Sequence, residues 1–419
     1  MLFRSQILDS RGSPTVEVDM SIDDGEIFRA SVPSGASTGK YEAVELRDNN
    51  DNYNGKSVHN AVSNVNDLIK NKIINKNFNS IYEFDNEILN LDNTANKSNL
   101  GANAILACSL SFIKCLANNC NKSLYEFLLT DQEYILPCPL MNIINGGAHA
   151  NNGLDIQEFM IIPAGFKSFS DSLQAGVETF LKLKELLNKK SYSTAVGDEG
   201  GFAPDLKTNE EALNLILDSI TLAGYEPGKN IFLALDVASS ELYNQGKYSY
   251  DNELLSSSEL IGVYKDLTSK FPIISIEDPL DEDDWESWRS ITKSLGNSIQ
   301  LVGDDLFVTN KSKLQMGIDT NAANSILVKI NQIGSISETL DTINMAKNNN
   351  YSYIISHRSG ETEDSSIADI AVGTKSGQIK TGSCSRSDRT AKYNQLLRIE
   401  DQLKGKCDFA GLSTFKISS

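Results

Sequence analysis

The segment PIISIEDPLDEDDWESW occupies residues 272–288. A short apolar run ends at Glu277, and seven acidic residues lie from Glu277 to Glu286. A run of this length between polar residues is typical of a buried strand, whereas a cluster of acids after a strand is usually a solvated loop. Glu277 therefore raises the question of whether one of these acids carries chemistry.

The same pattern of an apolar run that closes on an ionisable residue recurs through the second part of the chain. The runs are IFLALD, IISIE, IQLVGD, SILVK, YIISHR and GQIK, and they end at Asp236, Glu277, Asp304, Lys329, His357 with Arg358, and Lys380. Amphipathic helical patterns such as SLQAGVETFLKLKELL alternate with them. This alternation predicts a parallel barrel, in which the carboxyl ends of all strands meet at one mouth.

The first part of the chain has a different pattern. Residues 13–22 and 26–32 alternate apolar and polar residues around a DDG turn, which predicts a β-hairpin, and residues 57–129 carry helical periodicity. A length of 419 residues suits one barrel and a smaller companion. We therefore expect an N-terminal α+β domain at 1–130 and a parallel α/β barrel at 131–419.

Composition limits the partners. The formal net charge of −18 disfavours nucleic acid and anionic membrane surfaces, so an anionic substrate would need local positive charge. The six cysteines form no C-x-x-C pair, and Cys108 and Cys115 lie in an apolar helical stretch, which favours buried thiols. Without a signal peptide or a membrane span, we expect a cytoplasmic protein.

The strand-end residues indicate a metal site and a base. Asp236, Glu277 and Asp304 would repel one another unless they share a cation, and carboxylate oxygens suit Mg²⁺. A cation beside Lys329 would lower the pKa of the lysine and prepare it as a general base. Spacing alone leaves open that Lys329 only pairs with one of the acids.

Three further features complete the hypothesis. Arg358, followed by Ser359, is suited to binding an oxyanion or phosphate. Glu199, in the loop STAVGDEGGFAPD, could protonate a leaving group, although a helix cap is an equal alternative. The loop SGASTGK at 34–40 lacks the P-loop spacing, yet Ser37 offers a hydroxyl to a metal.

Asp278 should face away from the mouth, and Asp281 to Glu286 should begin the next helix.

Motifs along most of the chain point to one family. They are ILDSRGSPTVEV, VPSGASTGKYEAVELRD, NKSNLGANAILACSLS, PLMNIINGGAHANN, DIQEFMIIPAG, VGDEGGFAPDL, ALDVASSELY, SIEDPLDEDDW, LVGDDL, VKINQIGS, SHRSGETEDSSIADIAVG and GQIKTG with SRSDRTAKYNQLLRIE. In this order, they resemble the enolase family. The resemblance implies a TIM-type (β/α)8 barrel that begins ββαα, capped by the N-terminal domain.

The resemblance also implies a reaction, the Mg²⁺-dependent interconversion of 2-phospho-D-glycerate and phosphoenolpyruvate in glycolysis and gluconeogenesis. Lys329 would take the proton from carbon 2, and Glu199 would protonate the departing hydroxyl. Two Mg²⁺ ions are implied, the first on Asp236, Glu277 and Asp304 and the second near Ser37. The implied substrate-binding residues are His149, Gln157, Glu158, His357, Arg358, Ser359 and Lys380.

Members of this family are dimers or octamers, and by resemblance Glu17 and Arg398 pair across the dimer interface. Two alternatives remain. Another lyase or racemase of the superfamily would share the metal ligands, but it would need neither the Arg358 clamp nor Ser37. A surface-binding protein without activity would have no need of Glu199, Lys329 and Lys380.

Overall fold

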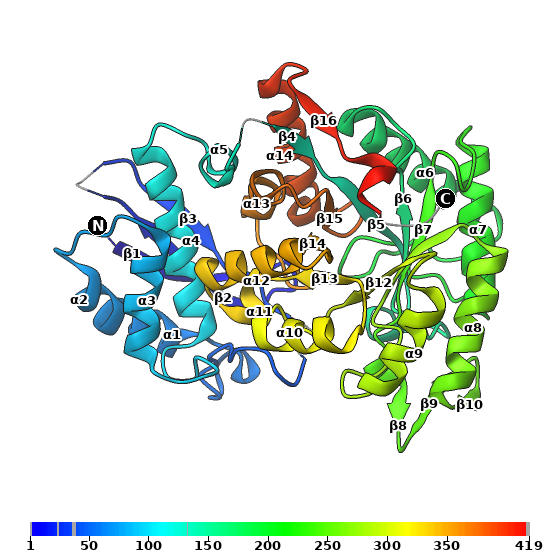
Figure 1. The fold of residues 1–419 in the computed structure, drawn as a ribbon, viewed down its shortest axis with the longest axis horizontal. Coiled ribbons are helices and arrows are strands. Elements are labelled where there is room, and N and C mark those ends of the chain that lie inside the picture. The colour runs from blue at the N-terminus through cyan, green and yellow to red at the C-terminus, as the bar shows by residue number, and fades with distance from the viewer. Residues whose placement is uncertain (1, 23–24, 36–38, 132, 416–419) are drawn as a thin grey trace.

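The computed structural model describes residues 2–22, 25–35, 39–131 and 133–415, with side chains from Ser5 onward. Ser37, the expected ligand of a second metal, lies outside these residues. A small α+β part, coloured blue to cyan, lies on one side of the molecule, and a closed barrel lies on the other (Figure 1). Within the described part of the chain, no helix combines the length and hydrophobicity needed to cross a membrane.

The N-terminal part is built on an antiparallel sheet with the strand order β1-β2-β3. Its strands are β1 (Leu2–Leu8), β2 (Pro14–Met20) and β3 (Phe28–Ser31). Its helices are α1 (His59–Ser63), a π-helical turn (Asn64–Ile69), α2 (Lys70–Ile73), α3 (Ile81–Asp92), α4 (Ala102–Asn119) and α5 (Leu124–Leu128). The expected hairpin is present as β2 and β3, and β1 adds a strand that the sequence analysis did not predict.

Alternation in β2 explains how this sheet packs. Val16, Val18 and Met20 are buried, and they lie on the face that packs against α4. Most of α4 is itself buried, including Cys108 and Cys115, as the apolar pattern predicted. All six cysteines are free thiols.

The barrel contains eight hydrogen-bonded strands. They are β5 (Cys138–Asn145), β6 (Glu158–Ile162), β7 (Phe232–Asp236), β11 (Ile273–Glu277), β12 (Gln300–Gly303), β13 (Ser325–Val328), β14 (Ser352–Ser356) and β15 (Gln378–Lys380). Strand β6 runs antiparallel to both neighbours, and the other pairs are parallel. Two helices follow β6 before β7, so the barrel begins ββαα as expected.

Helices surround the barrel. They are α6 (Phe169–Lys189), α7 (Asn209–Leu222), α8 (Ser257–Lys270), α9 (Trp285–Leu295), α10 (Lys311–Thr320), α11 (Ile330–Ile333), α12 (Ile336–Asn348), α13 (Ser366–Thr374) and α14 (Ser387–Leu403). A small sheet of β8 (Tyr243–Asn244), β9 (Lys247–Tyr250) and β10 (Glu253–Leu255) projects beside α8, and β4 (Tyr134–Leu136) pairs with β16 (Cys407–Phe409) (Figure 1).

The strand-end pattern predicted this architecture correctly. Asp236, Glu277 and Lys380 are the last residues of their strands, and Asp304, Lys329 and His357 each follow directly after a strand. Because β6 is reversed, its first residue, Glu158, lies at the same end and pairs in register with Asp236, which in turn pairs with Glu277.

The acidic segment after β11 differs from the expectation in part. Helix α9 begins only at Trp285, with Asp284 as its N-cap, whose side chain accepts the Ser287 N–H at 3.2 Å. Of the acids expected to begin this helix, Glu286 lies in its first turn. The other acids form the turn before the helix. The helix starts only after Asp284 because this N-cap residue satisfies the first N–H groups of the helix from outside it.

Two contacts bring the N-terminal part to the barrel mouth. Ser34 exchanges backbone hydrogen bonds with Gly360, after β14, and the Ala43 N–H donates to the Gln332 carbonyl at 2.8 Å. Farther along the interface, the Asp85 carboxylate of α3 accepts the N–H of Ser337 in the first turn of α12 at 2.8 Å. Ser34 and Ala43 are therefore each held against loops of the barrel.

Candidate active site

A narrow pocket opens at the carboxyl ends of the barrel strands, and almost every residue in its wall is polar or charged. It is lined by His149, Gln157, Glu158, Glu199, Asp236, Ala238, Asp278, Asp304, Asp305, Lys329, Ser356, His357, Arg358, Ser359 and Lys380. Such a wall suits a small, highly charged ligand rather than an apolar one. Most of the residues predicted from the sequence therefore line one cavity.

Lys380 lies at the centre of a group of buried acids. Its Nζ donates to Asp236 Oδ2 and to both oxygens of Glu277, each at 2.9 Å, and lies 3.3 Å from Glu158 Oε1. Burial raises the pKa of Glu277, and the neighbouring Asp236 raises it further, to well above its usual range. The acids at this mouth thus require positive charge among them.

Lys329 and Asp304 form a second buried ion pair. The other oxygen of Asp304 accepts the amide N–H of Gln332 at 2.8 Å, so the carboxylate is held from two sides. Burial lowers the pKa of Lys329, but the surrounding carboxylates, Asp304 first and then Glu277, together outweigh burial, and the pKa lies above its usual value. The lowered pKa that the sequence analysis expected applies to Lys329 with a cation bound beside it, and it stays a prediction.

Asp278 organises the backbone beside Asp304. Its carboxylate accepts the N–H of Asp304 at 2.9 Å and the N–H of Asp305 at 2.8 Å. We expected Asp278 to face away from the mouth, and that prediction was wrong: the strand ends at Glu277, and Asp278 has a φ of 41°, so strand alternation does not extend to it. Asp278 nevertheless supports the site, since it holds the loop that carries Asp304.

The carboxylate groups at the mouth are chemically suited to bind a divalent cation. Oxygens of Asp278, Asp304 and Asp305 lie within 4.8 Å of one another, and burial with the charge of Asp304 raises the pKa of Asp305 to about 8. Among the described residues, the expected triad of Asp236, Glu277 and Asp304 does not form a group this tight. Its members are instead neutralised by the ammonium groups of Lys380 and Lys329. Buried carboxylates that already need cations are the hard oxygen donors that Mg²⁺ prefers.

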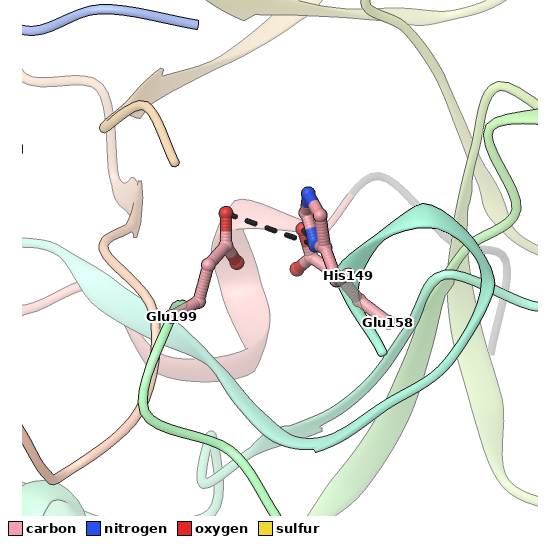
Figure 2. Close-up of side chains that lie close together, drawn as sticks. All are labelled: His149, Glu158 and Glu199. Carbon is pink, nitrogen blue, oxygen red and sulfur yellow. Dashed lines mark ion pairs between the residues drawn. The ribbon is translucent and has the colours of Figure 1, made fainter. Parts of the chain in front are cut away.

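A second cluster in the pocket wall consists of His149, Glu158 and Glu199, whose side chains point toward one another (Figure 2). His149 Nδ1 lies 3.7 Å from Glu158 Oε1 and 4.0 Å from Glu199 Oε1. Asn142 donates to Glu199 Oε2 at 3.2 Å, and His357 Nε2 lies 3.6 Å from the same oxygen.

The two glutamates of this cluster differ in pKa. Burial and the charge of Glu199 raise the pKa of Glu158 well above its usual range. Burial also raises the pKa of Glu199, but the neighbouring His357 and His149 side chains and the charges of Arg389 and Lys380 outweigh burial and hold this pKa well below its usual range. The two shifts run in opposite directions, so the Glu158 carboxyl holds a proton more readily than the Glu199 carboxyl.

Arg358 also lines the pocket. Its guanidinium donates to Glu42 Oε2 at 2.8 Å and to Glu42 Oε1 at 3.1 Å, and one of its nitrogens also donates to Asn331 Oδ1 at 3.2 Å. Ser359 lines the pocket beside it. Gln157, also predicted, donates to Asp236 Oδ2 at 3.4 Å, while its own oxygen has no hydrogen-bond partner among the residues that the structure describes.

Family models match almost the whole chain. A model for the N-terminal domain of enolase matches residues 2–128, and a model for the C-terminal TIM barrel domain of enolase matches residues 133–418. The chain belongs to the enolase family. The enolase barrel explains the reversed β6, and the acidic groups at its mouth are candidate metal sites of an enolase-superfamily enzyme.

Sequence reasoning did not find several residues that shape this enolase-family site. They are Glu42, Asn142, Asp305, Gln332 and Arg389. Asp305 and Gln332 had a signal, since each lies within three residues of a predicted site residue. Glu42 and Arg389 are brought to the mouth by long-range contacts, which spacing along the chain does not reveal.

Proposed function

We propose that this protein catalyses the reversible dehydration of 2-phospho-D-glycerate to phosphoenolpyruvate. The observation that carries the proposal is the placement of Lys329 and Glu199 in the wall of one small polar pocket that also contains Arg358 and Lys380. A base, an acid and two anion-binding cations are what this reaction requires.

In the proposed mechanism, the substrate phosphate binds at Arg358 and Ser359, and the carboxylate binds near Lys380. The amine of Lys329 removes the proton from carbon 2, and the resulting negative charge is delocalised into the carboxylate. Glu199 then donates its proton to the carbon-3 hydroxyl, which leaves as water while the carbon–carbon double bond forms. Lys329 thus gains the proton from carbon 2, and Glu199 loses the proton that leaves in the water.

Two conditions follow for these residues. Lys329 must be neutral to act as a base, so its pairing with Asp304 must be relieved in the loaded enzyme. When bound at the acidic residues, Mg²⁺ would supply the positive charge that stabilises the substrate anions beside these carboxylates. Asp236, Glu277 and Asp304 are the proposed ligands of the first ion, and Ser37 is a proposed ligand of the second.

The acid role also needs a proton on Glu199 rather than on Glu158. Each of these two carboxyl groups has an oxygen within 4.8 Å of the other and of a ring nitrogen of His149. We therefore propose that Glu158, with Gln157 and His149, forms the reservoir and the binding surface on the acid side, with His357 completing it.

The direct test is phosphoenolpyruvate formation from 2-phosphoglycerate with purified protein, measured with Mg²⁺ and after chelation. We expect activity that depends on Mg²⁺ and is lost in the Lys329→Ala variant. Absence of activity with the metal present would reject the proposal. Turnover of an unphosphorylated carboxylate instead would favour the alternative superfamily lyase or racemase.

We further propose a cytoplasmic homodimer in which Glu17 and Arg398 pair between subunits. Arg398 is exposed and contacts Gln395 within its own chain, while Glu17 lies 3.3 Å from Arg29. Light scattering after size-exclusion chromatography tests this: Arg398→Glu should weaken the dimer, and Glu17→Arg in the same chain should restore it. An octamer, or a monomer at every concentration, would contradict the dimer.

A further inference from the structure

Helix α14 carries two cationic side chains that have no exposed surface, Arg389 and Lys392. A buried guanidinium or ammonium group costs several kcal/mol unless it is fully paired. Lys392 is paired with the Glu361 carboxylate at 2.7 Å and with two backbone carbonyls. Its contacts tie the helix to the loop after β14 and do not touch the pocket.

Arg389, one helical turn earlier, reaches the walls of the pocket. One nitrogen donates to the Arg358 carbonyl at 2.6 Å, and the other donates to the Ser359 carbonyl at 2.6 Å and the Asp198 carbonyl at 3.1 Å. The Asp388 carboxylate lies 2.8 Å from its Nε. A single guanidinium therefore joins the loop of the proposed phosphate clamp to the loop of the proposed acid.

The same guanidinium contacts Nδ1 of His357. Arginine has five N–H donors, no acceptor, and does not lose its proton in proteins. Nδ1 must therefore accept this hydrogen bond, and the ring proton of a neutral His357 must reside on Nε2. Nε2 is the atom that lies 3.6 Å from Glu199 Oε2.

The surroundings also keep the ring neutral. Burial lowers the pKa of His357 well below its usual range, Arg389, Lys380 and Lys329 lower it further, and Glu199 is the opposing charge. Packing leaves the pair little freedom: a Cβ at Gly382, whose φ is +71°, would lie 2.9 Å from Arg389 Cδ and 3.1 Å from His357 Cε1.

We propose that Arg389 is a positioning residue that holds His357 as the Nε2–H tautomer, with this N–H directed at Glu199. This tautomer determines whether His357 can take the acid proton from Glu199. In the other tautomer, a bare Nε2 would face Glu199 and compete with the substrate for the acid proton. With Nδ1 occupied by Arg389, His357 can donate to Glu199 but cannot accept from it. The consequence for turnover rests on the proposed acid role of Glu199, whereas the tautomer itself does not.

Nitrogen-15 spectra of the histidine rings test the tautomer in the resting protein, without substrate. The chain has only three histidines, so His59→Gln and His149→Gln variants assign the spectrum. We expect an unprotonated Nδ1 and a protonated Nε2 for His357. A wild-type His357 protonated on Nδ1, or on both nitrogens at neutral pH, would overturn the proposal even if no Arg389 variant folds.

Variants separate positioning from simple stability. Arg389→Gln should release the tautomer and lower kcat about a hundredfold with KM nearly unchanged, because misplacement of a catalytic group affects the chemical step. Arg389→Lys should restore part of both signals. Lys392→Gln is the matched control, since it removes a buried cation from the same helix and should leave the His357 spectrum unchanged.

Three results of the variant series would overturn the proposal: an unchanged spectrum in Arg389→Gln, an equal change in Lys392→Gln, or a loss confined to KM. Failure of the proposed reaction is distinguishable from these results. It would appear as an inactive wild-type enzyme with the expected His357 spectrum.

Discussion

Arg358 and Glu42 form a buried two-point ion pair between residues 316 positions apart in the chain. The guanidinium proposed to bind the substrate phosphate is thus already in contact with a carboxylate of the N-terminal part. The same carboxylate accepts the N–H of Gly39 at 3.0 Å, at the end of the loop that carries Ser37. The proposed phosphate binding at Arg358 would therefore be linked through one acid to the backbone at Gly39.

Replacing Glu42 by Gln should strengthen phosphate binding. The substitution keeps an acceptor for Gly39 but removes the negative charge that competes for Arg358. Because charged hydrogen bonds contribute about 1.5–3 kcal/mol, we expect about tenfold tighter binding of inorganic phosphate by calorimetry. Glu87→Gln is the control, since Glu87 pairs with Lys72 and Lys76 instead. Weaker binding in Glu42→Gln would mean that Glu42 orients Arg358 rather than competing for it.

The base and the acid can be separated by exchange of the carbon-2 proton with solvent deuterium, followed by NMR. Lys329→Ala should abolish both exchange and dehydration, each by at least about 10²-fold, since general bases contribute 10²–10⁴-fold. Glu199→Gln should lose dehydration and retain measurable exchange. Lys311→Ala, on the exposed face of α10, should change neither. Equal loss of exchange in both site variants would leave the assignment of roles without support.

Asp278 should affect metal affinity without binding substrate. Asn in its place keeps one acceptor and turns an NH₂ group toward an N–H of residue 304 or 305. We expect divalent metal to bind about 10- to 100-fold more weakly, as for other residues that orient metal ligands, and stability to fall by about 2 kcal/mol. A Mn²⁺ titration measures the first effect. Asp281→Asn, in the turn after the mouth, is the control, and equal affinity in both variants would contradict the prediction.

Asp85 should make stability depend on pH. Burial raises its pKa to about 6, from an ordinary value of 3.8. A raised pKa means that the folded state binds the proton more tightly, so this contribution to stability is complete below about pH 3.8 and is lost as the pH rises through about 6. Above that pH, the buried charge costs about 3 kcal/mol.

Asp85→Asn removes this titration while keeping an acceptor for the Ser337 N–H. Urea unfolding midpoints measured from pH 4 to pH 7 should therefore fall less with rising pH in Asp85→Asn than in the wild type. Asp67→Asn, an exposed acid of the same domain, serves as the control. Parallel pH profiles for wild type and Asp85→Asn would contradict the assignment.

How far the sequence predicted this molecule depends on the range of the interaction. Strand ends are local signals, so Asp236, Glu277 and Lys380 could be placed at the mouth from apolar runs alone, and barrel closure follows from their repetition. Asp278 was misjudged because a positive φ ends the alternation, and that backbone change leaves no mark in the apolar pattern.

Charge states were less predictable than positions. The pKa of Lys329 depends on the rotamer that brings it to Asp304, and the buried cations of α14 are indistinguishable in sequence from the exposed charges of any amphipathic helix. Both depend on three-dimensional contacts between distant segments. The reversed direction of β6 was expected only from the family resemblance, since apolar runs do not encode strand direction.

The contacts of Glu42, Arg358 and Arg389 also bear on how the enzyme is made. A ribosome releases the N-terminal part first, and Glu42 must wait for Arg358, 316 residues later, before its partner exists. Arg389, which joins the two loops of the pocket, emerges later still, with the last long helix. A nascent chain therefore lacks the contacts of Arg389 until α14 has been translated, and the two loops of the pocket are joined only after that point.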